Sequence, residues 1–108
     1  VDQKTVDITK DFTKEGTATK TPGETFAFTI EKVSVTDSQY TEDDMPMFNP
    51  TTFDITFDEG DINGSHTLDL PDYAKVGIFT YKITETQGNT AGVIYADPIY
   101  LKVCHNWW

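Results

Sequence analysis

Two ionisable residues stand at positions where a strand pattern places apolar side chains. Each shares its phase with three apolar neighbours: Lys10 with Val6, Ile8 and Phe12, and Glu85 with Phe79, Tyr81 and Ile83. Because successive side chains of a strand point to opposite faces, both Lys10 and Glu85 are predicted to point into the core. Burying either charge alone costs on the order of several kcal/mol, so the two residues raise the question of a shared site.

A buried lysine and a buried glutamate can make a covalent bond. Burial favours the uncharged forms of both groups. An uncharged lysine amine is a nucleophile, and a protonated glutamate can polarise an amide carbonyl and shuttle protons. If an asparagine side chain lies against the amine, attack on it expels ammonia and leaves a Lys–Asn isopeptide bond within the chain. This reaction happens once, so the residues predict self-crosslinking and no enzyme. The structural alternative is that each residue sits at a strand end and reaches water.

The elements that would position these residues are short strands. Period-two apolar patterns predict strands over 5–12, 25–35, 53–57, 66–70, 77–85 and one or two more within 93–103. A phase change near Val33 indicates a bulge, and Pro98 indicates an edge or a bend. The stretches 13–24 and 36–52 are predicted loops, the second with room for a short helical turn. The pattern is typical of an all-β, immunoglobulin-like sandwich of six to eight strands.

Composition limits the classes of function. The 108 residues suffice for a single domain over 1–108, and the formal net charge of -10 disfavours nucleic acid and anionic membrane surfaces as partners. No apolar run is long enough to span a membrane. Cys104 is the only cysteine in the sequence, so no disulfide can form within the chain. A secreted domain of this size needs another source of robustness.

Four stretches resemble the streptococcal pilin isopeptide-linkage domain, a family of Gram-positive major pilins and surface adhesins. They are 6–10 (Val-Asp-Ile-Thr-Lys), 25–30 (Thr-Phe-Ala-Phe-Thr-Ile), 77–86 (Gly-Ile-Phe-Thr-Tyr-Lys-Ile-Thr-Glu-Thr) and 92–95 (Gly-Val-Ile-Tyr). The Gly-x-x-Thr-Tyr-x-Ile-x-Glu stretch is the most specific, and the resemblance covers most of 5–103. It implies a structural module of a pilus or adhesin on the cell wall, with neighbouring domains or pilin subunits of the same fibre as partners.

The resemblance also implies roles for individual residues. In the family, a lysine on the first strand joins an asparagine on the last strand, and a glutamate between them is the catalyst. Lys10 matches the lysine, as nucleophile, and Glu85 matches the catalytic glutamate. The family's final strand, of the type apolar-Thr-Phe-x-Asn, has no match here.

The acceptor therefore stays open between several alternatives. Asn106 is the asparagine nearest the end of the sequence, although the phase of the preceding strand points it outward unless a bulge intervenes. Asp97 has the inward phase and is the alternative acceptor. A further expectation is that the domain is truncated before its last strand. In that case Lys10 stays unreacted, and an open groove accepts a complementing strand from elsewhere.

The sequence gives weaker support to a metal site or a carbohydrate-binding site. A zinc site would need His66, His105 and Cys104 to converge with a carboxylate, and the acidic turn at 58–63 lacks the length and terminal glutamate of a calcium loop. We expect no metal and no cofactor. The rival function is a carbohydrate- or host-ligand-binding module on the same sandwich, for which Trp107 and Trp108 could supply stacking surfaces.

Overall fold

The fold was analysed in a computed structural model that describes residues 4–11, 23–86 and 96–106. Within these residues the chain is all β, with six strands and no helix. The strands are β1 (Thr5–Asp11), β2 (Glu24–Thr36), β3 (Thr52–Phe57), β4 (Asn63–Asp69), β5 (Gly77–Glu85) and β6 (Ile99–His105). The all-β sandwich predicted from the sequence is confirmed.

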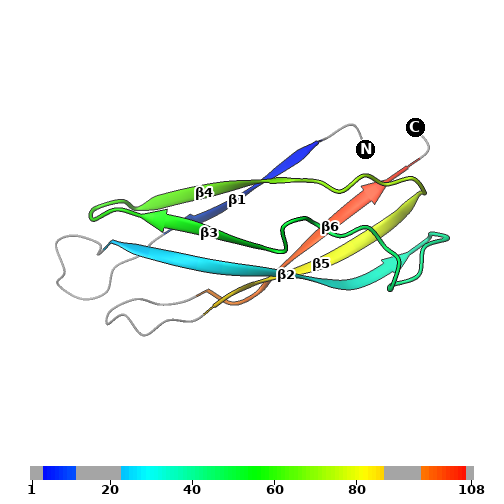
Figure 1. The fold of residues 1–108 in the computed structure, drawn as a ribbon, viewed down its shortest axis with the longest axis horizontal. Coiled ribbons are helices and arrows are strands. Elements are labelled where there is room, and N and C mark those ends of the chain that lie inside the picture. Colours follow the sequence, from blue (N-terminus) through cyan, green and yellow to red (C-terminus); the bar gives the residue numbers. More distant parts are fainter. Residues whose placement is uncertain (1–3, 12–22, 87–95, 107–108) are drawn as a thin grey trace.

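The strands form two antiparallel sheets that face each other (Figure 1). One sheet has four strands in the order β3-β2-β5-β6, and the other has two, β1 and β4. In the two-stranded sheet, Lys10 lies opposite Gly64. In the four-stranded sheet, β5 pairs with β2 on one side and with β6 on the other. The molecule is elongated along its strands, with extents of 53 × 23 × 20 Å.

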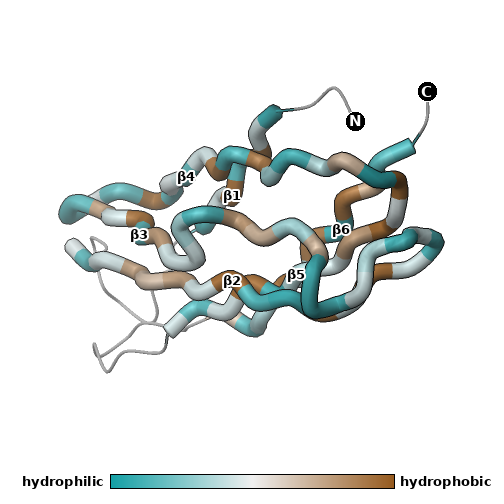
Figure 2. The backbone as a smooth tube through the Cα atoms, turned by 45° about the vertical axis from the view of Figure 1, so that its right-hand side comes forward, coloured by the Kyte–Doolittle hydropathy of each residue, from teal (hydrophilic) through white to brown (hydrophobic). Residues whose placement is uncertain are grey.

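The core lies between the two sheets, because every strand contributes alternate apolar side chains to it. β5 shows this most regularly, with every second residue from Gly77 to Glu85 buried. Apolar and polar residues alternate along the strands in Figure 2. Aromatic rings fill much of the core: Phe26 meets Phe57 edge to face with centroids 5.4 Å apart, and Phe28 stacks on Phe53 at 4.9 Å. Such ring pairs stabilise the packing beyond the area that they bury.

The irregular segment between β2 and β3 belongs to the core. Met45 and Phe48 are each 2% exposed, and the Tyr81 hydroxyl donates a hydrogen bond to the carbonyl oxygen of Pro46 at 2.6 Å. The sequence predicted a loop here with room for a helical turn, and the structure has turns and bends but no helix. These two buried side chains and the hydrogen bond from Tyr81, which lies on the inner face of β5, hold the segment against the sheet.

Most strand boundaries agree with the sequence prediction. The predicted bulge lies in β2, where the pairing with β5 shifts between Lys32 and Ser34. Pro98 directly precedes β6, which is an edge strand, as its position predicted. β4 begins at Asn63, three residues earlier than predicted, because it pairs with β1 as far as Asp11. β2 begins at Glu24, the last residue of the loop predicted over 13–24. Residues 13–22 of that loop and residues 93–95 of the predicted last strand lie outside the described residues.

The two sides of the sandwich differ. On one side, residues 58–62 connect β3 of one sheet to β4 of the other, which closes the sandwich. On the other side, β1 and β6 are the outer strands of their sheets, and no described strand pairs with their second edges. They run in opposite directions, so the end of β1 lies near the start of β6 (Figure 1). In the part of the chain that the structure describes, no helix is long and apolar enough to cross a membrane.

Candidate functional site

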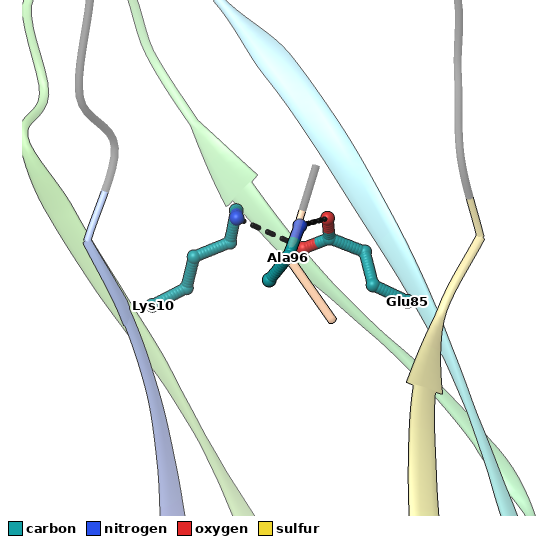
Figure 3. Close-up of polar contacts among 3 residues, drawn as sticks. All are labelled: Lys10, Glu85 and Ala96. Atoms are coloured by element: carbon teal, nitrogen blue, oxygen red, sulfur yellow. Dashed lines mark hydrogen bonds and ion pairs between the residues drawn. The ribbon is translucent and has the colours of Figure 1, made fainter. Parts of the chain in front are cut away.

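Lys10 and Glu85 meet in the core. Lys10 is the sixth residue of β1 and Glu85 is the last residue of β5, so the two come from different sheets. The Lys10 Nζ lies 2.9 Å from the Glu85 Oε1, and the two residues are only 9% and 5% exposed (Figure 3). The period-two pattern therefore placed both side chains on the correct faces of their strands. A buried charge is rare in proteins unless it is paired.

The Glu85 carboxylate is held by the backbone of the segment that leads into β6. The Ala96 N–H donates a hydrogen bond to Oε2 at 2.8 Å (Figure 3). The second oxygen, Oε1, is buried and accepts no hydrogen bond of good geometry among the described residues, so its partner is the Lys10 nitrogen. One carboxylate oxygen is thus fixed, and the other is aimed at the lysine.

An aromatic ring covers the lysine from the other sheet. The Lys10 Nζ lies 4.4 Å from the centroid of the Phe26 ring, and Phe26 is 1% exposed. The face of an aromatic ring attracts a cation, and this attraction strengthens where water is excluded. Phe26 and Glu85 together therefore keep Lys10 in one place, with its nitrogen directed at the carboxylate.

A cavity of about 160 Å³ adjoins the pair. Residues from the end of β1, the inner face of the four-stranded sheet and the start of β6 line it: Ile8, Thr9, Lys10, Asp11, Phe28, Ile83, Glu85, Ala96, Asp97 and Ile99. Its lining is mostly apolar, and its charged residues are Lys10 and three acids, Asp11, Glu85 and Asp97. An amine held beside carboxyl groups in a largely apolar cavity is a setting in which an amide bond can form.

The structure places the two acceptor candidates very differently. Asp97 lines the same cavity as Lys10 and Glu85. The pairing of Ile83 with Ile99, continued by two residues, sets Asp97 opposite Glu85. Both candidates are exposed, but Asn106 follows His105, which pairs with Gly77 at the other end of β5. Gly77 and Glu85 are eight residues apart, which is about 26 Å of strand, so Asn106 is not brought to the pair.

The residues considered for a metal lie apart. His66 stacks on Phe53 with centroids 4.8 Å apart, His105 stacks on Tyr73 at 6.0 Å, and Cys104 is exposed. Among the described residues, no three or more histidine, cysteine or acidic side chains group in a way that could hold a metal ion. In the acidic turn, the Asp58 N–H donates to the Asp61 Oδ2 at 2.9 Å, which closes the turn on itself. Trp107 and Trp108 lie outside the described residues.

Sequence reasoning missed two contributors to the site. Ala96 acts through its backbone N–H, which any residue but proline would supply, so no sequence signal could have identified it. Phe26 belongs to the predicted strand over 25–35, but its position over Lys10 depends on how the two sheets face each other. Residue patterns within one strand carry no information on that arrangement.

Comparison with known proteins identifies the family. No curated protein and no solved structure gives a significant match to the chain. The sequence model of the FctA family, described as the Spy0128-like isopeptide containing domain, matches residues 6–104. This match spans β1 to β6, including Lys10, Glu85 and the cavity between them. The chain therefore belongs to the Spy0128-like isopeptide-containing domain family.

Proposed function

We propose that this chain is a structural module of a Gram-positive pilus or surface adhesin, strengthened by an isopeptide bond that it forms itself. The buried Lys10–Glu85 pair, 2.9 Å apart, in a chain of this family is the observation that carries the proposal. Lys10 is the nucleophile and Glu85 is the proton shuttle. The placement of Asp97 at the same cavity supports it as the acceptor in preference to Asn106.

The proposed reaction joins the Lys10 and Asp97 side chains and releases one molecule of water. Glu85 takes a proton from the Lys10 ammonium, and the freed amine attacks the side-chain carbonyl carbon of Asp97. A C–N bond forms and a C–O bond of the Asp97 carboxylate breaks. Glu85 relays two protons from the nitrogen to the departing oxygen, the first taken from the ammonium and the second from the tetrahedral adduct, so that the oxygen leaves as water and Glu85 is regenerated. The Ala96 hydrogen bond to Oε2 leaves Oε1 as the atom that carries the proton. With Asn106 as acceptor, the same step would release ammonia.

The bond would close the open side of the sandwich. Lys10 lies in the two-stranded sheet and Asp97 directly precedes β6 of the four-stranded sheet, so the crosslink would tie one sheet to the other. Opposite it, residues 58–62 already connect the sheets. A module bonded on both sides would resist separation of its sheets under a pulling force, as a surface fibre requires. Its partners would be neighbouring domains or subunits of the same fibre on the cell surface.

Tandem mass spectrometry of a protease digest tests this proposal. The expected product is a branched peptide in which the Lys10 side chain is joined to the Asp97 side chain. Its absence from the Glu85→Gln variant would assign the proton transfer to Glu85. Recovery of only linear peptides containing an unmodified Lys10 from the wild-type chain would refute the self-crosslinking module.

A further inference from the structure

The outer face of the two-stranded sheet is acidic. Alternation along β1 and β4 turns every second side chain away from the core, and each of these outward residues is exposed. They are Thr5, Asp7, Thr9, Asp11, Asn63, Ser65, Thr67 and Asp69. Three of them are aspartates and none is a lysine, so this face of the sandwich carries negative charge alone.

Two of these aspartates form a close pair. Asp7 is the partner of Thr67, and Asp69 lies two residues farther along β4, so Asp7 and Asp69 are diagonal neighbours about 7 Å apart. The Thr67 hydroxyl donates a hydrogen bond to the Asp7 Oδ1 at 2.7 Å, which holds that carboxylate in place. Neither aspartate has an ion-pair partner among the described residues. The face therefore presents two carboxylates at a defined spacing and without a countercharge.

The opposite side of the sandwich carries a lysine pair with the same spacing. On the outer face of β5 and β6, Lys82 is the partner of Tyr100, and Lys102 lies two residues farther along β6. The two lysines are therefore also diagonal neighbours about 7 Å apart. Tyr100, on the same face, is 63% exposed. Glu31 on β2 lies opposite Lys82, but within the described part of the chain neither lysine has an ion-pair partner.

This charge complementarity favours a second copy of the chain as the occupant of both faces. Opposite charges across an interface steer association and set its register. Because the two spacings are equal, the aspartate pair of one copy can contact the lysine pair of the next at both points together. Tyr100 adds an exposed aromatic ring, a side chain enriched at interfaces. A foreign acidic partner would fit the lysine pair alone, whereas a second copy uses both faces.

The net charge of the chain opposes this contact only at long range. The formal net charge is -10, so two copies repel each other as wholes. At physiological ionic strength, interactions between exposed charges are largely screened beyond about 8 Å. Ion pairs in contact are shorter than this distance, so the local arrangement of charges decides whether the two faces hold together.

We propose that copies of this chain associate side by side, with the outer face of the two-stranded sheet of one copy on the outer face of β5 and β6 of the next. The two faces lie on opposite sides of the sandwich (Figure 1), so the contact does not close and can repeat from copy to copy. Exposed ion pairs contribute little singly, so the Kd between isolated copies is expected on the order of 1 mM. Copies aligned along a fibre would add their contacts and bind neighbouring fibres to one another, a consequence that rests on the proposed function.

NMR chemical shifts measured against chain concentration test the contact. The expected result is a set of shifts that change between about 0.05 and 2 mM, confined to the outer faces of β1, β4, β5 and β6. Physiological salt screens the net charge, and a reductant is present because the exposed Cys104 could otherwise join copies by a disulfide. Shifts that stay constant with concentration, or that change on one of the two faces alone, would overturn the proposal.

Charge reversal separates local complementarity from net charge. Asp7→Lys/Asp69→Lys removes two acids and adds two lysines, which changes the formal net charge from -10 to -6 and reduces overall repulsion. The proposal nevertheless predicts that this variant associates at least tenfold more weakly. Lys82→Glu/Lys102→Glu is expected to lose association as well. An equimolar mixture of the two variants is expected to regain it, because the unchanged lysine face of the first meets the unchanged aspartate face of the second.

The control is Glu42→Lys/Asp43→Lys, which makes the same change of net charge at exposed residues between β2 and β3. It leaves both faces intact and is expected to associate no more weakly than the wild type. Association of the Asp7→Lys/Asp69→Lys variant at wild-type strength, or a mixture that stays monomeric, would contradict the proposed contact. All these variants keep the lysine, glutamate and aspartate of the proposed crosslink, so either outcome leaves that proposal to its own test by mass.

Discussion

At the scale of single residues, the central feature is the buried charged pair of Lys10 and Glu85. Either charge would be unfavourable in the core without the other. Lys10 has the Glu85 carboxylate on one side and the Phe26 ring on another, and Glu85 has the Ala96 N–H. Removing one member of a buried pair leaves an uncompensated charge, and the cost commonly exceeds what the intact pair contributes. The pair is therefore poorly explained by stability alone, which agrees with a chemical role.

The substitution Glu85→Gln is expected to lower the free energy of unfolding of the uncrosslinked chain by about 3–5 kcal/mol, because Lys10 is left buried without a countercharge. To keep the reference uncrosslinked, the comparison uses the Asp97→Ala background. Urea denaturation gives the value, and the exposed Lys102→Met substitution is the control, with an expected change within about 0.5 kcal/mol. If the double substitution Lys10→Met/Glu85→Gln is no more stable than Glu85→Gln alone, the destabilisation does not come from the orphaned lysine.

At the scale of elements, a chain of tyrosine hydroxyls holds the segment between β2 and β3 on the sheet. The Tyr73 and Tyr81 hydroxyl oxygens are 2.8 Å apart, and the Tyr81 hydroxyl donates to the Pro46 carbonyl. Tyr40 extends this cluster, because its hydroxyl accepts the Ala74 N–H at 3.1 Å. Burial, followed by the hydrogen bond with Tyr73, raises the pKa of Tyr81 far above its ordinary value of 10.0.

This raised pKa predicts a loss of stability at alkaline pH. The folded chain keeps the Tyr81 proton at a pH where the unfolded chain releases it, so this contribution is fully present below about pH 10 and is lost as the pH rises further. Urea denaturation between pH 8 and 11 measures the slope. Tyr81→Phe is expected to flatten it and to lower stability at pH 8 by about 1–3 kcal/mol through the lost hydrogen bonds. The exposed Tyr100→Phe is the control, and equal slopes for both variants would contradict the assignment.

The elements also show how far the sequence could predict this structure. Alternation alone predicted the strands and the inward direction of Lys10 and Glu85, because the phase of a strand is local information. The burial of Met45 and Phe48 was not predictable in the same way, since an irregular segment has no period and its contacts come from β5. The acceptor depends on the register between β5 and β6, which places Asp97 near Glu85 and Asn106 at the far end.

At the scale of the whole molecule, the proposed bond would constrain most of the chain. A link between positions 10 and 97 closes a loop of nearly ninety residues, and by analogy with a disulfide of that loop length it would contribute roughly 4–5 kcal/mol. The chain has one cysteine, so no disulfide within it could serve the same purpose. The bond would thus give covalent stabilisation to a small domain that cannot form a disulfide within its own chain.

Calorimetry of the Asp97→Ala variant measures this contribution while the Lys10–Glu85 pair stays intact. Its midpoint of thermal unfolding is expected to fall by at least about 15 °C relative to the crosslinked wild type, because each kcal/mol corresponds to several degrees in a domain of this size. Asp54→Ala, which removes an exposed carboxylate on β3, is the control and should shift the midpoint little. Equal midpoints for Asp97→Ala and the wild type would mean that Asp97 closes no crosslink.

The intact mass of the purified chain tests the central claim, the bond-forming role of Lys10 and Glu85, most directly. The wild-type chain is expected to be lighter than its sequence mass by one water, and Lys10→Ala and Glu85→Gln are each expected to have their full sequence mass. A deficit of one ammonia in the wild type would keep the lysine as nucleophile and transfer the acceptor role from Asp97 to an amide side chain such as Asn106. A wild-type mass equal to the sequence mass would contradict the claim.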